Sequence, residues 1–243
     1  MANNDVVTFF GILLLPGGER NDDFVRILAL ESVRNRVVVV GEDLGTVEPS
    51  IRETLARFGI LSYRLFYFEK NERGEFRRTD EYPRQSLVSS TTHDLPTLAG
   101  FWVGADITAR RAAGTIDDEV LGAQLQQRRT EKQKMLDVLF QLELVSEDLP
   151  RSAEAYAELT GELHNAIIGF LAMTPSQLLA INQEDLTKEV DQQNLPGSTW
   201  QYPNWGRKMR FTIEQLRGDA ETRGFTTMFH DWIERSGRRN QRD

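Results

Sequence analysis

Two acidic side chains follow an apolar run at a point where an α/β enzyme would place its chemistry. Val37 to Val40 are four consecutive valines, and Gly41, Glu42 and Asp43 come directly after them. A continuous β-branched run predicts a strand buried on both faces, as in a parallel sheet. The carboxyl ends of such strands hold the reactive side chains of open sheets and barrels. Glu42 is therefore a candidate catalytic acid, and the alternative interpretation is that Glu42 or Asp43 caps the following helix.

Polar groups also follow two other predicted strands. His93 and Asp94 come just after residues 86–92, and a second polar group follows residues 177–181, namely Asn182, Glu184 and Asp185. In a barrel the carboxyl ends of the strands converge on one face, so these side chains would share a pocket. Two carboxylates flanking a bond are the minimum equipment for glycoside cleavage, one as the acid and one as the nucleophile or base.

Aromatic side chains would supply flat apolar faces for sugar rings. Trp200, Tyr202 and Trp205 lie in one loop, where binding of a sugar is the favoured interpretation. For Tyr67 and Phe101, packing in the core is favoured instead.

The elements that must position these groups alternate between strand and helix. Strands are predicted at 63–68, 86–92 and 177–181 in addition to the valine run, and helices at 24–28, 49–58, 107–144, from near 152 to 171, and around 229–233. Gly59 suits the position just past a helix end. Residues 6–15 are predicted to be a strand and not a signal peptide, because no Lys or Arg precedes them. This alternation implies a parallel sheet, and the polar strand ends suggest a barrel.

Composition narrows the function. The chain has 243 residues and a net charge of -8, which argues against binding nucleic acid through phosphates. It has no cysteine and three histidines without metal-ligand spacing, so neither a metal nor a cofactor is expected. No apolar stretch is long enough to span a bilayer, and a cytoplasmic location is expected.

Three motifs, in this order, resemble the carboxyl-terminal part of the 4-α-glucanotransferases, also called amylomaltases (glycoside hydrolase family 77). They are Val40-Gly41-Glu42-Asp43-Leu44-Gly45-Thr46-Val47, then Thr91-Thr92-His93-Asp94-Leu95-Pro96-Thr97, and then Asn194-Leu195-Pro196-Gly197-Ser198 through Tyr202-Pro203-Asn204-Trp205. The resemblance covers residues 22–243, whereas residues 1–21 form an unmatched segment. It implies roughly the second half of a (β/α)8 barrel, with helical insertions, acting on maltodextrins or other α-1,4-glucans.

The resemblance also implies roles for single residues. Glu42 would be the general acid/base, which protonates the leaving oxygen and later activates the acceptor hydroxyl. Asp94 would be the second catalytic carboxylate, which grips sugar hydroxyls and stabilises the distorted transition state. His93, Asn194, Asp43 and Trp205 would bind the substrate.

One part of the family's site has no counterpart here. A retaining mechanism needs a nucleophilic carboxylate, which in this family is an Asp two residues after an Arg, at the end of the strand before the one bearing the acid. Arg20-Asn21-Asp22 has the spacing but is predicted to open a helix. We therefore expect an incomplete barrel that lacks transferase activity alone and that a partner chain or self-association completes. The alternatives are a non-catalytic α-glucan-binding or assembly module, and an inverting hydrolase that uses Glu42 and Asp94.

Overall fold

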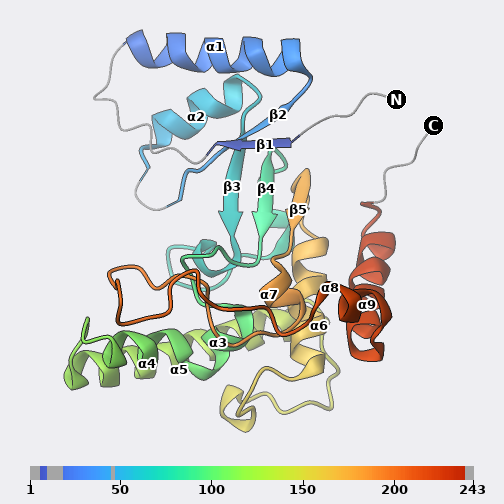
Figure 1. The fold of residues 1–243 in the computed structure, drawn as a ribbon. Helices are drawn as coiled ribbons and strands as arrows, with labels where there is room; N and C mark the ends of the chain where they lie inside the picture. Colours follow the sequence, from blue (N-terminus) through green and yellow to red (C-terminus); the bar gives the residue numbers. More distant parts are fainter. Residues whose placement is uncertain (1–5, 10–18, 45–46, 239–243) are drawn as a thin grey trace.

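One parallel sheet organises residues 6–9, 19–44 and 47–238, which are the residues that this computed structural model describes (Figure 1). Its five strands lie side by side in chain order: β1 (Val6–Phe9), β2 (Val38–Gly41), β3 (Leu61–Leu65), β4 (Ser86–Ser89) and β5 (Leu178–Ala180). Every neighbouring pair is parallel. Sequential parallel strands joined by helices are the pattern of a barrel segment, which confirms the expected α/β class and partial barrel.

Helices connect and cover the strands. The described residues form α1 (Glu19–Asn35), α2 (Pro49–Arg57), α3 (Leu98–Val103), α4 (Ala105–Ala112), α5 (Asp118–Gln141), α6 (Gly161–Ala172), α7 (Gln183–Leu186), α8 (Ile213–Gly218) and α9 (Ala220–Arg235). Short 3-10 turns occupy Phe66–Phe68, Thr79–Glu81 and Ala153–Ala155. Four helices, α3 to α6, lie between β4 and β5, so the expected helical insertion is present at this connection.

Local signals explain where several helices begin and end. Pro49 occupies the first turn of α2, where its missing N–H costs nothing, and Gly59 follows the helix end at φ +74°. The Thr160 side chain accepts a hydrogen bond from Leu163 N and so caps α6. The N-cap position of α2 is Glu48, so the interpretation of Glu42 or Asp43 as its cap is wrong. Thr46, a further candidate cap, lies outside the described residues.

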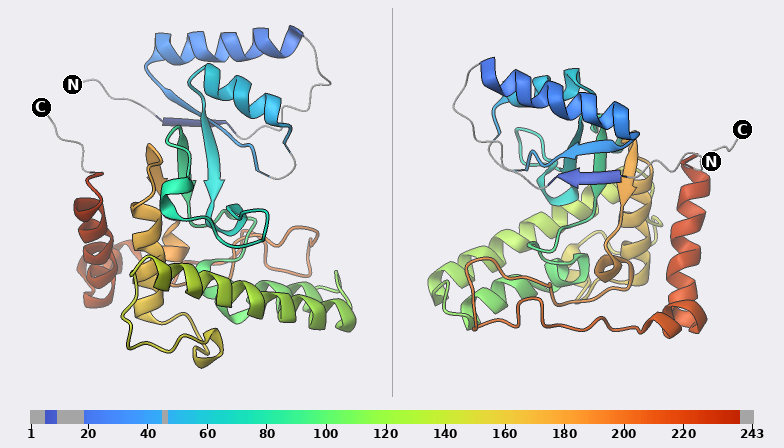
Figure 2. Two further views of the ribbon diagram at one scale, coloured as in Figure 1. Left: turned by 180° about the vertical axis from the view of Figure 1, so that it is seen from behind. Right: turned by 45° about the horizontal axis from the view of Figure 1, so that its top comes forward.

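Two apolar clusters hold the helices against the sheet. The larger cluster joins the outer face of β4 to α3, α5 and α6 and includes Val88, Trp102 and Phe170. Helix α9 stands beside α6 (Figure 2), where Trp232 Nε1 donates to Asn165 Oδ1 at 2.8 Å. The smaller cluster joins α1, β2 and the start of β3 through side chains from each, namely Val25, Val39 and Ile60.

Three element boundaries differ from the sequence prediction. The aromatic strand 63–68 ends at Leu65, because Phe66 and Tyr67 are both buried in the larger cluster and a strand would turn one of them away. The strand 86–92 ends at Ser89, where the following hydroxyls turn to bond Asp185. The helix expected from near residue 152 begins only at Gly161. Across the described residues, no helix has the length and apolar character needed to cross a membrane.

Candidate active site

Alternation along β2 points Glu42 to the side of the sheet opposite the helices. Val39 packs in the cluster with α1, and a Cβ on Gly41 would lie 3.1 Å from Leu55 of α2, so these residues face the helices. Glu42 comes next and is half-buried. Successive side chains in a strand face opposite sides, so Glu42 shares the inner side with Tyr63 of β3. The pKa of Tyr63 is raised, first by burial and then by the nearby Glu42 charge, although a hydrogen bond with Ser89 opposes the rise.

Asp43 faces the helices and is fully engaged there. Its Oδ1 accepts from Tyr63 N at 2.8 Å, and its Oδ2 accepts from Arg52 Nε at 3.0 Å and Arg64 Nη2 at 3.4 Å. Its side chain is 1% exposed. The structure therefore places Asp43 away from the pocket, in contacts that tie the end of β2 to β3 and α2.

The other four expected site residues lie together. Asn194 Nδ2 donates to Asp94 Oδ1 at 2.6 Å, and Asn194 N donates to the His93 carbonyl at 3.1 Å. His93 Nε2 lies 3.4 Å from Asp94 Oδ2, and the His93 ring lies 5.0 Å from the Trp205 ring. The Asp94 side chain is 49% exposed and Trp205 is 64% exposed, so a ligand can reach both. A carboxylate, an imidazole, an amide and an indole thus converge from two loops that are far apart in the sequence.

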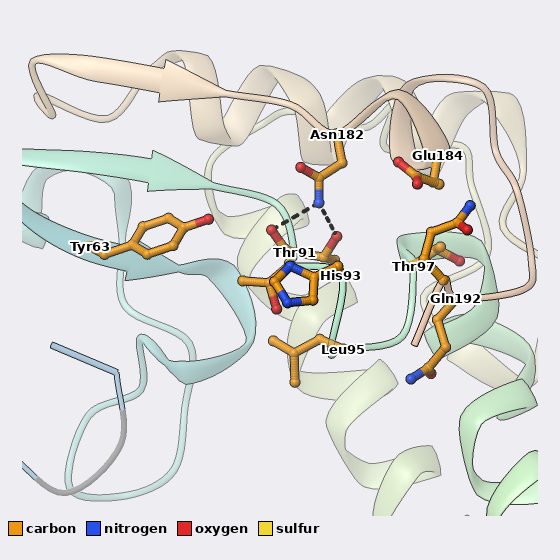
Figure 3. A pocket seen from close by; sticks show the side chains of 10 residues that line it. Tyr63, Thr91, His93, Leu95, Thr97, Asn182, Glu184 and Gln192 are labelled. Carbon is orange, nitrogen blue, oxygen red and sulfur yellow. Dashed lines mark hydrogen bonds between the residues drawn. The ribbon is translucent and has the colours of Figure 1, made fainter. Parts of the chain in front are cut away.

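Beside this cluster lies a polar pocket of about 190 Å³ (Figure 3). Its lining comes from β3, from the loop after β4 and from the segment after β5: Tyr63, Thr91, Thr92, His93, Leu95, Thr97, Asn182, Glu184, Gln192 and Gln193. The Asn182 amide donates to the carbonyl and the hydroxyl of Thr91, both at 3.0 Å, and fixes the pocket wall there. Hydroxyl, amide and carboxylate groups around a small pocket are suited to a polyhydroxylated ligand.

A buried pair of ionisable side chains lies behind the pocket. Asp185 is 0% exposed, and burial raises its pKa to about 6 even though it accepts three hydrogen bonds. His164 Nε2 lies 2.8 Å from the Asp185 carbonyl, and burial lowers the pKa of His164 to about 4. A carbonyl only accepts, so Nε2 of the neutral ring carries the hydrogen.

The aromatic predictions divide as expected from the sequence. Tyr67 and Phe101 are buried and stack at 4.5 Å between ring centroids, which confirms core packing. Trp200 and Trp205 are exposed, whereas Tyr202 is buried and donates from its hydroxyl to the Gln192 carbonyl.

Sequence reasoning missed part of the pocket. Gln192 and Gln193 line it, and their position just before the Asn194 motif was the available signal. It also left Asp185 as one of several polar residues at a strand end, because its contacts join segments about ninety residues apart.

The strand beside β2 carries no acid. In β1, Phe9 pairs with Gly41, the residue before Glu42. Residues 6–18 contain neither Asp nor Glu, and Arg20 and Asp22 lie in the first turns of α1 rather than at a strand end. Within the described ranges, no cluster of three or more His, Asp or Glu side chains is arranged to hold a metal ion.

Comparison with known proteins agrees with this geometry. A family model described as 4-alpha-glucanotransferase matches residues 18–213. The 4-alpha-glucanotransferase of Haemophilus influenzae is 36% identical over 188 residues, 77% of this chain and 27% of the relative. The Mycobacterium bovis protein of the same name is 35% identical over 190 residues, 76% of this chain and 25% of the relative. The chain thus spans about a quarter of the length of these curated relatives.

Solved structures show the same likeness. The crystal structure of amylomaltase from Corynebacterium glutamicum matches with a TM-score of 0.75 and 32% identity, over 86% of this chain and 31% of that one. Amylomaltase from Streptococcus agalactiae in complex with acarbose matches at a TM-score of 0.51 and 14% identity, which supports the fold alone. Because the matched residues run through β2, the Asp94 loop and the Asn194 loop, this chain belongs to the 4-alpha-glucanotransferase family.

Proposed function

We propose that this chain binds α-1,4-glucans at the pocket and contributes the acid/base part of a glucanotransferase site. The single observation that carries the proposal is the convergence of His93, Asp94, Asn194 and Trp205 beside a polar pocket. The exposed Trp205 ring offers an apolar face to a sugar, and the Asp94 carboxylate and Asn194 amide offer hydrogen-bond partners to its hydroxyl groups.

Glu42 is proposed as the proton donor and acceptor. In retaining transfer, a nucleophilic carboxylate displaces the leaving glucan from the anomeric carbon while an acid protonates the glycosidic oxygen. The acceptor hydroxyl then attacks the same carbon, and the former acid takes its proton. Glu42, half-buried on the inner side of the sheet, would serve in both steps, and Asp43 would hold the backbone that presents it.

The nucleophile is the part that the chain does not supply in this proposal. β1 pairs with β2, yet residues 6–18 hold no carboxylate. We therefore expect the isolated chain to bind maltodextrins without rearranging them. A partner chain or a second copy would have to supply the nucleophile, because β1 and β5 form the two edges of the sheet over the described residues.

Two measurements separate binding from turnover. Titration with maltohexaose, followed by tryptophan fluorescence, should give saturable quenching that Trp205→Ala abolishes and Trp200→Ala, an exposed control in the same loop, preserves. Incubation with maltotriose should leave its chromatogram unchanged. Formation of glucose with longer maltodextrins would show that the chain is active alone, and absence of saturable binding would contradict the glucan site itself.

A further inference from the structure

A single carboxylate holds both ends of the loop that carries His93 and Asp94. The Asp185 side chain, from α7, accepts hydrogen bonds from the Ser90 and Thr91 hydroxyls at 2.5 Å, just before the loop. It also accepts a hydrogen bond from Leu98 N at 2.7 Å, just after the loop. Asp185 thereby fixes the point where the chain leaves β4 relative to the point where it enters α3.

Further contacts run from the same segment to the same loop. The Asn182 amide holds the carbonyl and hydroxyl of Thr91, and the Thr97 hydroxyl donates to the Glu189 carbonyl at 2.6 Å. Further along, Asn194 reaches Asp94. The segment after β5 therefore runs beside the loop, with Asp185 as its one fully buried carboxylate.

We propose that Asp185 is a positioning residue for glucan binding, which sets the His93–Asp94 loop against Asn194 and Trp205 without itself touching the sugar. The inference rests on the proposed function of the pocket. Thr91 lines the pocket, whereas Asp185 lies behind it and is absent from the lining. A carboxylate suits this position because it only accepts, so all three donors are oriented towards it, and hydrogen bonds to a charged acceptor are shorter and stronger than neutral ones.

The decisive variant is Asp185→Asn, which preserves shape but presents an NH2 group where hydroxyl groups now donate. Its matched control is Asp106→Asn, because Asp106 is buried at a distance from the pocket and accepts from Arg128 Nη1 and Nη2, each at 2.9 Å. We expect Asp185→Asn to weaken maltohexaose binding about tenfold, as for loss of one to two hydrogen bonds. Amide exchange in residues 92–97 should also accelerate. Asp106→Asn should lower the melting temperature without either change.

A milder pair of variants decides the question if Asp185→Asn does not fold. Ser90→Ala removes one donor to Asp185, and Ser86→Ala removes an equally buried hydroxyl at the other end of β4, where it bonds Ser176. Only Ser90→Ala should accelerate exchange in residues 92–97.

Two results would overturn the inference: native binding and native exchange in Asp185→Asn, or equal exchange in the two serine variants. The exchange measurement needs no ligand. If the native chain fails to bind maltohexaose, the proposed function fails while the role of Asp185 in holding the loop is still decided.

Discussion

The buried pair Asp185 and His164 predicts a pH dependence that the native chain conceals. Burial raises the pKa of Asp185 from 3.8 to about 6, and burial lowers the pKa of His164 from 6.5 to about 4. At pH 5 the folded chain therefore protonates Asp185 and leaves His164 neutral, whereas the unfolded chain does the reverse. Folding moves a proton from one side chain to the other, with almost no net uptake.

The sign of each contribution follows from linkage. The folded state binds the extra proton at Asp185 between pH 3.8 and 6, so this group lowers the free energy of unfolding as pH rises through that window. The unfolded state binds the extra proton at His164 between pH 4 and 6.5, so that group raises the free energy of unfolding as pH rises. At about 1.4 kcal/mol per pKa unit, each contribution is worth about 3 kcal/mol, and the two nearly cancel.

Single substitutions should expose the two contributions. In His164→Gln, whose amide can still donate to the Asp185 carbonyl, the free energy of unfolding relative to the native chain should rise by about 3 kcal/mol between pH 7 and pH 4. In Asp185→Asn it should fall by about the same amount over the same range. Taking each difference from the native chain removes the titration of all other groups.

Urea unfolding at half-unit pH intervals, followed by circular dichroism, measures both curves, with the m-value checking that the unfolding reaction is unchanged. Parallel pH profiles for the two variants and the native chain would refute the reasoning, since neither group would then titrate differently in the folded state. Opposite slopes in the reverse sense would refute the assigned causes.

Three further predictions concern single positions. Trp205→Gly should raise the free energy of unfolding by about 1 kcal/mol, because Trp205 has a φ of +58°, yet it should abolish maltohexaose quenching. Gly100→Ala should lower the melting temperature, because its Cβ would lie 2.2 Å from the Val190 carbonyl oxygen; an unchanged melting curve would contradict that packing. Asp43→Ala should cost about 3 kcal/mol in urea unfolding by stranding buried partners, whereas Asp23→Ala, at an exposed ion pair, should cost less than about 1 kcal/mol; equal costs would show that the Asp43 network carries no stability.

The sequence predicts those parts of the fold and site that depend on local pattern. The valine run is a strand, Gly59 follows a helix end, and the ordered motifs bring Asp94 and Asn194 into contact. These succeed because strand pairing in chain order and short polar loops leave few alternative arrangements.

Features that depend on contacts between distant segments could not be read from the sequence. The turn of the chain at Phe66 reflects burial against α6, not the β propensity of the aromatic residues. The direction in which Asp43 points is set by Arg52 and Arg64, on two other elements. Asp185 looked like one more acid at a strand end, and only the packed structure shows its three donors.

The pairing of β1 with β2 has a consequence for any attempt to restore catalysis. The β2 edge next to Glu42 is already hydrogen-bonded along the register from Val6↔Val38 to Phe9↔Gly41. A strand bearing a nucleophile, whether added as a peptide or supplied by another chain, must compete with a tethered segment of this chain for the same backbone groups. Such competition is governed by effective concentration, so a variant without β1 would accept an incoming strand more readily than the native chain.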